Sequence, residues 1–212
     1  MTIDGVLLGI LNNYFRAAAE AAGYTLERTA YTTFIKESQD FTTGLVTPAG
    51  QHFAFPVSIG AQSYVGIDYA TFIAALAPWQ EGDIGIANCP FATRGVSTHL
   101  PDYQLLKPIF AEGELMGFAW AFIHSSDMGG IVAGSIQPSA YELFQEGIRI
   151  TPKKLYARGE LQSEIKEFLL SNVRIPDKNW GDLNAVVAAL GIAERRVQTA
   201  VEKWGRDTVR AG

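Results

Sequence analysis

The stretch YQLLKPIFAEGELMGFAWAFI at residues 103–123 carries the clearest structural pattern in the chain. It contains two runs of β-forming residues, Tyr103–Phe110 and Leu115–Ile123, joined by Ala-Glu-Gly-Glu at 111–114. Two such runs around a glycine-containing turn predict a β-hairpin. Three aromatic residues alternate along the second run and are expected in the core: Phe118, Trp120 and Phe122.

Smaller elements are expected before this hairpin. Apolar residues at helical spacing predict a helix over Asp4–Ala22, with Gly23 as its C-cap. An earlier hairpin is predicted from Phe41 to Val57, around the turn Pro48-Ala49-Gly50. A short helix at Asp68–Leu76 and a strand at Ile84–Asn88 follow.

Beyond the hairpin the pattern changes from strand to helix. Asp127–Ser135 is a glycine-rich loop, and Ser139–Glu142 fits a capping box that begins a short helix. Further helices are predicted near 161–169 and over Leu183–Trp204, the second interrupted or kinked at Gly191. The expected class is α+β, a mixed or antiparallel sheet with hairpins, flanked by helices. Residues 1–212 are expected to form one domain, with a helical C-terminal segment from about residue 160.

Composition excludes several classes of protein. A chain of 212 residues that is 48% hydrophobic and 18% charged can bury a core. With a net charge of −5 and no basic cluster longer than Arg195–Arg196, nucleic acid is not an expected partner. No apolar run approaches the roughly 20 residues of a membrane-spanning helix. Cys89 is the only cysteine and is expected to be buried. Because the N-terminus also lacks a secretory pattern, we expect a cytoplasmic protein without membrane partners.

Two histidines and one aspartate lie at the open end of the 103–123 hairpin. His99-Leu-Pro-Asp102 comes just before its first strand, and His124 follows its second. If the turn is centred on Gly113, Asp102 lies opposite His124, with Cβ atoms roughly 5 Å apart. If the loop is one residue longer, His124 faces Pro101 and lies diagonal to His99. Both registers bring the three side chains to one end of the hairpin.

Two imidazoles and one carboxylate are a standard ligand set for Zn²⁺, Mn²⁺ or Fe²⁺, with positions left open for water or substrate. Asp127, three residues after His124, is interpreted as a catalytic carboxylate that orients an imidazole or a bound water; direct ligation is the alternative. The same residues also fit a purely structural interpretation, in which His99 caps a turn and Asp102 forms an Asx-turn.

Other polar residues receive simpler interpretations. His52 is expected at the surface, and Glu146 and Arg149 are expected to form a surface ion pair. Lys36, Glu37 and Asp40 are read as solvated charges, although Asp40 could project into a site. The sequence contains neither a G-x-x-x-x-G-K-[ST] phosphate loop nor a G-x-G-x-x-G fingerprint, so any nucleotide is expected to bind elsewhere.

Many short stretches, taken in order, resemble the hydantoinase B/oxoprolinase family. They run from Arg28–Thr42 to Ala193–Val197, and are densest in Thr98-His-Leu-Pro-Asp102 and His124-Ser-Ser-Asp-Met-Gly-Gly130. The resemblance implies that the histidine and aspartate of the first motif and the histidine of the second are metal ligands. The sequence departs from the family's pattern at Asn88-Cys89-Pro90, where an aspartate is common, and at Ser58, where a histidine is common.

The resemblance also implies an activity and partners. It implies a metal-binding subunit, with Zn or Mn, of an ATP-dependent cyclic-amide hydrolase. ATP is then bound by an actin-like ATPase subunit of the hydantoinase A type. Because family members commonly run to more than twice this length, a further subunit is expected to supply the remaining half.

Three alternatives remain open at this point. The chain could belong to an ATP-dependent ketone carboxylase of the acetone or acetophenone type, which the resemblance also covers. It could be a non-catalytic assembly subunit of such a complex. Its two histidines and aspartate also fit a non-haem iron oxygenase.

Overall fold

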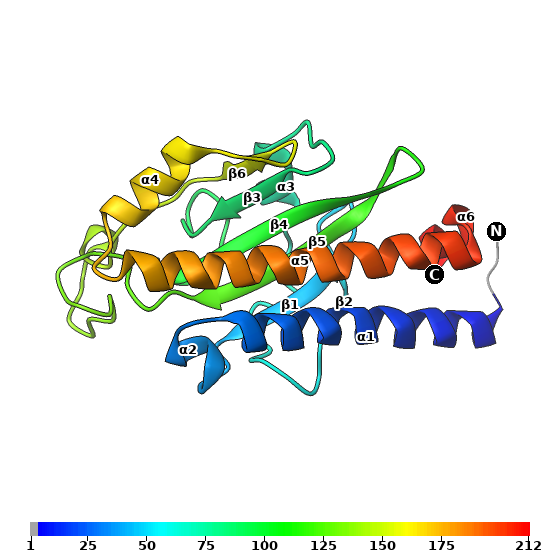
Figure 1. The fold of residues 1–212 in the computed structure, drawn as a ribbon, viewed down its shortest axis with the longest axis horizontal. Helices are drawn as coiled ribbons and strands as arrows, with labels where there is room; N and C mark the ends of the chain where they lie inside the picture. The colour runs from blue at the N-terminus through cyan, green and yellow to red at the C-terminus, as the bar shows by residue number, and fades with distance from the viewer. Residues whose placement is uncertain (1–3) are drawn as a thin grey trace.

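The computed structural model describes residues 4–212 and contains one seven-stranded antiparallel sheet with helices packed against it (Figure 1). The strand order is β2-β1-β5-β4-β3-β6-β7. The strands are β1 (Phe41–Val46), β2 (His52–Ala54), β3 (Ile84–Ala87), β4 (Asp102–Ala111), β5 (Glu114–His124), β6 (Lys153–Ala157) and β7 (Glu160–Leu161). The helices are α1 (Gly5–Thr29), α2 (Thr33–Lys36), α3 (Ala70–Ala75), α4 (Ser163–Ser171), α5 (Pro176–Trp204) and α6 (Arg206–Ala211). The α+β class predicted from the sequence is confirmed.

The two faces of the sheet are covered differently. The long helices α1 and α5 lie side by side on one face and run in opposite directions (Figure 1). Small residues of β5, Ala119 and Ala121, belong to the core beneath these helices. The alternate residues Phe118, Trp120 and Phe122 are buried on the other face, in a second core with residues of α3 and the segment before it. The expectation that these aromatic residues lie in the core is therefore confirmed. No helix within residues 4–212 is both long enough and apolar enough to span a membrane.

The β4–β5 hairpin has the predicted register at its open end but a tighter turn than predicted. Ala111 pairs with Glu114, so only Glu112 and Gly113 form the turn, both with positive φ (51° and 77°). This is the two-residue geometry that matches the twist of antiparallel strands. A bulge at Met116 then adds one residue to β5. Beyond the bulge the pairing continues to Asp102 opposite His124.

Both glycines predicted to end or bend a helix lie inside unbroken helices. Helix α1 runs through Gly23 to Thr29, so the prediction of a C-cap at Gly23 was wrong. A Cβ at this position would lie 2.9 Å from Ile59 Cγ2 and 3.3 Å from Thr43 Oγ1, so the glycine lets the helix approach the sheet closely. Helix α5 begins at Pro176 and is continuous through Gly191, because packing along its length outweighs the roughly 1 kcal/mol that glycine costs.

Three further expectations also need correction. The capping box is formed by Glu142 and Gln145 around a 3-10 turn at Leu143–Gln145, not by Ser139. The described residues show no ion pair between Glu146 and Arg149; the Glu146 carboxylate instead accepts a hydrogen bond from the Leu100 backbone N–H. His52 is partly buried rather than a solvated surface residue, because β2 places its ring edge-on against Tyr69 and Trp120 at centroid distances of 5.1 and 4.5 Å.

The first turns of α5 hold the segment that joins α1 to α2. The buried Asp182 carboxylate accepts hydrogen bonds from the backbone N–H groups of Tyr31 and Thr32 and from the Thr32 hydroxyl. Gly181 lies against the Tyr31 ring, where a Cβ would meet ring carbons at 2.5 to 2.9 Å. Because α2 continues directly into Asp40 and β1, this anchor also fixes one wall of the region around His124.

We expect Asp182→Ala to lower the free energy of unfolding by about 3 kcal/mol, because it leaves two buried donors of Thr32 and the partly buried Tyr31 N–H without an acceptor. The control is Asp177→Ala, which removes an exposed carboxylate from the first turn of the same helix and should cost no more than about 1 kcal/mol. Urea unfolding measures the change in the free energy of unfolding for both variants, provided that their m-values are equal. Equal stability of the two variants would show that the Asp182 anchor is unimportant.

The burial of His52 predicts a pH effect on stability. Burial lowers the pKa of His52 to about 4, whereas the unfolded chain titrates near the ordinary value of about 6.5. Between these values the unfolded state binds a proton that the folded state does not, so stability falls as the pH drops from about 6.5 to 4. The loss from this residue should reach roughly 3 kcal/mol at most, and His52→Gln should remove it. An NMR titration of His52 with a midpoint near 6.5 would contradict this.

Candidate metal centre

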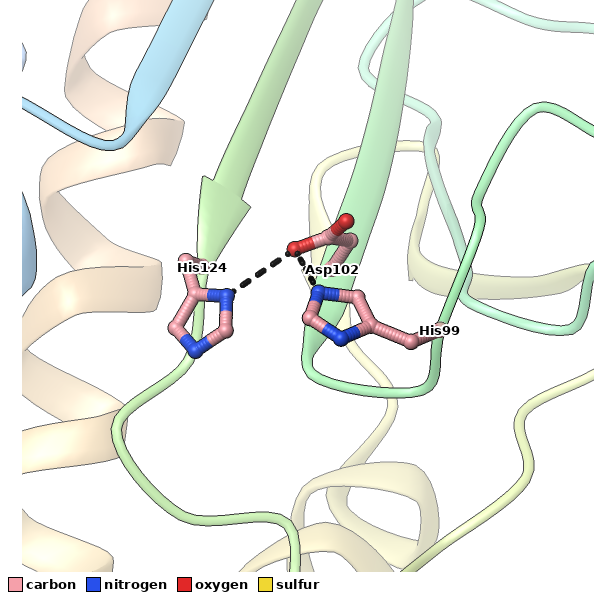
Figure 2. Close-up of side chains that lie close together, drawn as sticks. All are labelled: His99, Asp102 and His124. Carbon is pink, nitrogen blue, oxygen red and sulfur yellow. Dashed lines mark hydrogen bonds and ion pairs between the residues drawn. The ribbon is translucent and has the colours of Figure 1, made fainter. Parts of the chain in front are cut away.

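His99, Asp102 and His124 come together at one end of the sheet (Figure 2). His99 Nε2 lies 2.8 Å and His124 Nδ1 lies 3.1 Å from the same carboxylate oxygen, Asp102 Oδ1. One donor atom from each residue lies within 4.8 Å of the other two. Asp102 and His124 are buried, whereas the His99 side chain is 35% exposed. The group is therefore rigid on the sheet side and accessible from the His99 side.

Backbone pairing and a short turn position these side chains. Asp102 and His124 are a cross-strand pair of β4 and β5, whose side chains project on the face opposite α1 and α5. The turn that carries His99 is held by the hydrogen bond from Ser125 N–H to the Pro101 carbonyl, 2.7 Å long. The Asn88 amide also binds this turn, because its Nδ2 donates to the Leu100 carbonyl at 2.7 Å.

Asn88 is one of the positions at which the sequence departs from the family's pattern. Its side chain is fully buried; Nδ2 donates to the carbonyls of Leu100 and Ile148, while Oδ1 accepts from Ile150 N–H. An ionised aspartate could not donate to either carbonyl. The amide is therefore matched to the local backbone, and it joins the His99 turn to the segment after the glycine-rich loop.

The electrostatics of the site favour an ionised Asp102. Burial alone raises the pKa of Asp102, but hydrogen bonds from His124, His99 and Tyr64 and the charge of His99 lower it below its usual range. For His99, burial lowers the pKa, and the hydrogen bond and charge of Asp102, with Glu146 and Asp40, bring it above its usual value. A carboxylate is thus available as a ligand at neutral pH.

Three further residues lie near the site, and of these only Asp40 was considered for it from the sequence. Asp40 Oδ2 lies 3.7 Å from His124 Nδ1, so the option that Asp40 projects into a site matches its position. Burial raises the pKa of Asp40, with the Asp102 charge adding to this and the two histidines opposing it. The Tyr64 hydroxyl donates to Asp102 Oδ2, and Glu146 accepts from Leu100 N–H in the His99 turn.

Asp127, the predicted catalytic residue, has other hydrogen-bond partners in the structure. Its carboxylate accepts from the backbone N–H groups of Gly129, Gly134 and Arg174 and from the Arg174 guanidinium at 3.0 Å. The same guanidinium donates to the carbonyls of Gly129, Gly130 and Val132. Burial raises the pKa of Asp127, but these donors bring it below its usual range. The carboxylate thus organises the glycine-rich loop, and its catalytic role stays a prediction.

The residues present fit a divalent metal. Two imidazole nitrogens and a carboxylate oxygen converge, and this is the donor set of many Zn²⁺, Mn²⁺ and Fe²⁺ sites. In addition, His124 Nε2 is buried without a hydrogen-bond partner among the described residues. The His124 atom that converges with Asp102 is Nδ1, so an ion bound there would leave Nε2 to a bound water or a partner group, and the fit to a metal rests on the three convergent donors.

Comparison with known proteins defines the family. The Hydantoinase B/oxoprolinase family matches residues 4–212, and the chain belongs to this family. It is 33% identical to 5-oxoprolinase 1 of Arabidopsis thaliana over 98% of the chain and 17% of that protein. It is 29% identical to caprolactamase subunit beta of Pseudomonas jessenii over 99% of the chain and 36% of that protein.

Solved structures agree with the fold. The crystal structure of the ATP-dependent caprolactamase from Pseudomonas jessenii superposes with a TM-score of 0.84 at 27% identity, and the match covers 100% of this chain and 36% of that one. A nucleotide-free acetone carboxylase superposes with a TM-score of 0.83 at 22% identity, over 98% of this chain and 28% of that one, which shows the shared fold. The chain spans only about a third or less of the length of these relatives.

The position of Asp127 leads to a test of its role. We expect Asp127→Asn to lower the free energy of unfolding by about 2 kcal/mol, because it removes a buried charge that faces Arg174. Metal stoichiometry should remain that of the unaltered protein. Elemental analysis and urea unfolding measure the two effects separately. Loss of metal equal to that of His124→Ala would instead make Asp127 a direct ligand.

Proposed function

We propose that this chain is the metal-binding part of an ATP-dependent cyclic-amide hydrolase of the hydantoinase/oxoprolinase type. The observation that carries the proposal is the convergence of His99, Asp102 and His124 within 4.8 Å on a fold that belongs to the hydantoinase B/oxoprolinase family. The relatives named 5-oxoprolinase and ATP-dependent caprolactamase support amide hydrolysis as the reaction class.

The three residues would hold one divalent ion, with zinc or manganese fitting the donor set best. Such an ion would polarise a carbonyl oxygen or lower the pKa of a water molecule. The chain's own residues set up this site. Asp102 supplies the negative charge between the two imidazoles, and the exposed edge of His99 leaves the site open toward the substrate. Asp40, 37% exposed and close to His124, adds a second carboxylate at the rim.

ATP would be bound by a partner. The sequence has no phosphate-binding loop of the P-loop or dinucleotide type. The matched caprolactamase is named ATP-dependent, and the subunit of it that resembles this chain is named subunit beta. We propose an actin-like ATPase of the hydantoinase A type as that partner, acting with the polypeptide that lies outside the matched region in the longer relatives. The partner would activate the amide carbonyl, and the metal site would complete its hydrolysis.

Metal content tests the site directly. We expect the purified chain to hold about one divalent ion, and His99→Ala and His124→Ala each to lose it while keeping the far-ultraviolet circular dichroism of the fold. The third histidine gives a matched control, because His52→Gln should keep the ion. Metal measured after dialysis against a weak chelator decides the question. Unchanged content in both alanine variants would overturn the site.

Coupling to ATP is tested by reconstitution. The chain alone should hydrolyse no ATP, whereas the complex assembled with an actin-like ATPase and the remaining subunit sequence should release ADP only when a cyclic amide such as a hydantoin or 5-oxoproline is present. The His124→Ala complex should lose amide hydrolysis. Bicarbonate-dependent turnover of a ketone, without turnover of any cyclic amide, would contradict the hydrolase and favour a carboxylase.

A further inference from the structure

Tyr64 lies against the candidate metal centre but belongs to a loop far from its ligands in the sequence. Its hydroxyl donates to Asp102 Oδ2, the carboxylate oxygen that faces away from the two imidazoles. Its ring packs edge-on against Phe122, two residues before His124 on β5, with ring centroids 4.8 Å apart. The tyrosine therefore contacts both strands that supply the site.

The donors and acceptors around the Tyr64 hydroxyl fix the direction of each hydrogen bond. The Thr98 backbone N–H donates to the Tyr64 hydroxyl oxygen at 3.2 Å, and the Thr98 hydroxyl lies 2.9 Å from the same oxygen. An ionised carboxylate can only accept, so the single Tyr64 proton goes to Asp102. The Thr98 hydroxyl must then donate to Tyr64. Both Thr98 donors thus orient the phenol toward Asp102.

The backbone at Tyr64 is unusual. Its φ is +65°, in the left-handed region that bulky side chains rarely adopt. Such a conformation persists only where surrounding contacts enforce it, and it often marks a functional position. Here the contacts with Asp102, Thr98 and Phe122 are the ones that hold the side chain in place.

We propose that Tyr64 is a positioning residue that occupies Asp102 Oδ2, so that only Oδ1 is presented to the ion held with His99 and His124. The inference rests on the proposed function, because it concerns the same metal. By restricting Asp102 to one oxygen, Tyr64 limits the number of oxygen ligands. A small ligand set that includes two imidazoles suits zinc, whereas a site with additional oxygen ligands suits manganese. The tyrosine therefore sets the metal preference of the site as well as its affinity.

The test compares zinc and manganese affinities of the metal-stripped chain and of Tyr64→Phe. Removing a group that orients a metal ligand typically weakens metal binding about 10- to 100-fold. We expect the zinc affinity of Tyr64→Phe to fall at least about 10-fold. The fold-loss of manganese affinity should be at least about threefold smaller than that of zinc, because Oδ2 becomes free to bind manganese. Chelator competition measures zinc, and electron paramagnetic resonance of the free ion measures manganese.

Two further variants make the result decisive. Tyr24→Phe is the matched control, because its hydroxyl hydrogen-bonds to Ser58, away from the site, and both affinities should be unchanged. Thr98→Val keeps Tyr64 but removes one of the groups that donate to its hydroxyl. Like Tyr64→Phe, it should weaken zinc binding more than manganese binding, but by smaller factors. Circular dichroism of the metal-free protein shows whether Tyr64→Phe folds. If it does not fold, the affinities of Thr98→Val decide the question.

The possible outcomes separate this inference from the proposed function. A wild-type chain that binds neither ion overturns the proposed function. A wild-type chain that binds zinc, with Tyr64→Phe within twofold of it for both ions, overturns only the role of Tyr64. Equal weakening of zinc and manganese would also overturn it, because a merely structural residue would act on both alike.

Discussion

The one-residue bulge at Met116 is the constraint on which the candidate site depends, because it decides which residues of β4 and β5 face each other. Between the turn and the bulge, Ala111 pairs with Glu114 and Phe110 with Leu115. If that register continued to the open end, His124 would lie opposite Pro101, and Asp102 opposite Ile123, whose side chain belongs to the core under the helices. The bulge corrects the register by one residue and so places a carboxylate beside an imidazole.

The start of helix α5 then stabilises the loops around that pair. Asp182 binds the α1–α2 segment, and the Asn179 amide donates to the Asp127 carbonyl at 2.6 Å. Arg174, just before the helix, binds three carbonyls and a carboxylate of the glycine-rich loop. Because one rigid helix holds both the segment before β1 and the loop after β5, the backbone on either side of His124 is fixed. The loops that flank the strand ends of the site are thereby held on a rigid element.

Much of the fold and the three central residues could be predicted from the sequence, since hairpins and cross-strand pairs follow from local patterns. Counting from a turn centred on Gly113 reached the correct partner of His124, although the actual turn is tighter and Met116 supplies the missing residue. Gly23 and His52 were misjudged because their environments depend on packing against distant strands. Tyr64 carried no signal, since nothing in its own loop indicates that it meets Asp102, 38 residues later.

His99, Asp102 and His124 are proposed to bind one ion at the open end of the β4–β5 hairpin. The most direct measurement is anomalous X-ray diffraction from crystals of the protein grown with zinc or manganese. A single anomalous peak is expected about 2.0–2.3 Å from one nitrogen of each histidine and from Asp102 Oδ1, with Tyr64 still bonded to Oδ2. A fully occupied ion bound elsewhere, with the two imidazoles still bonded to Asp102 as in the metal-free protein, would contradict it.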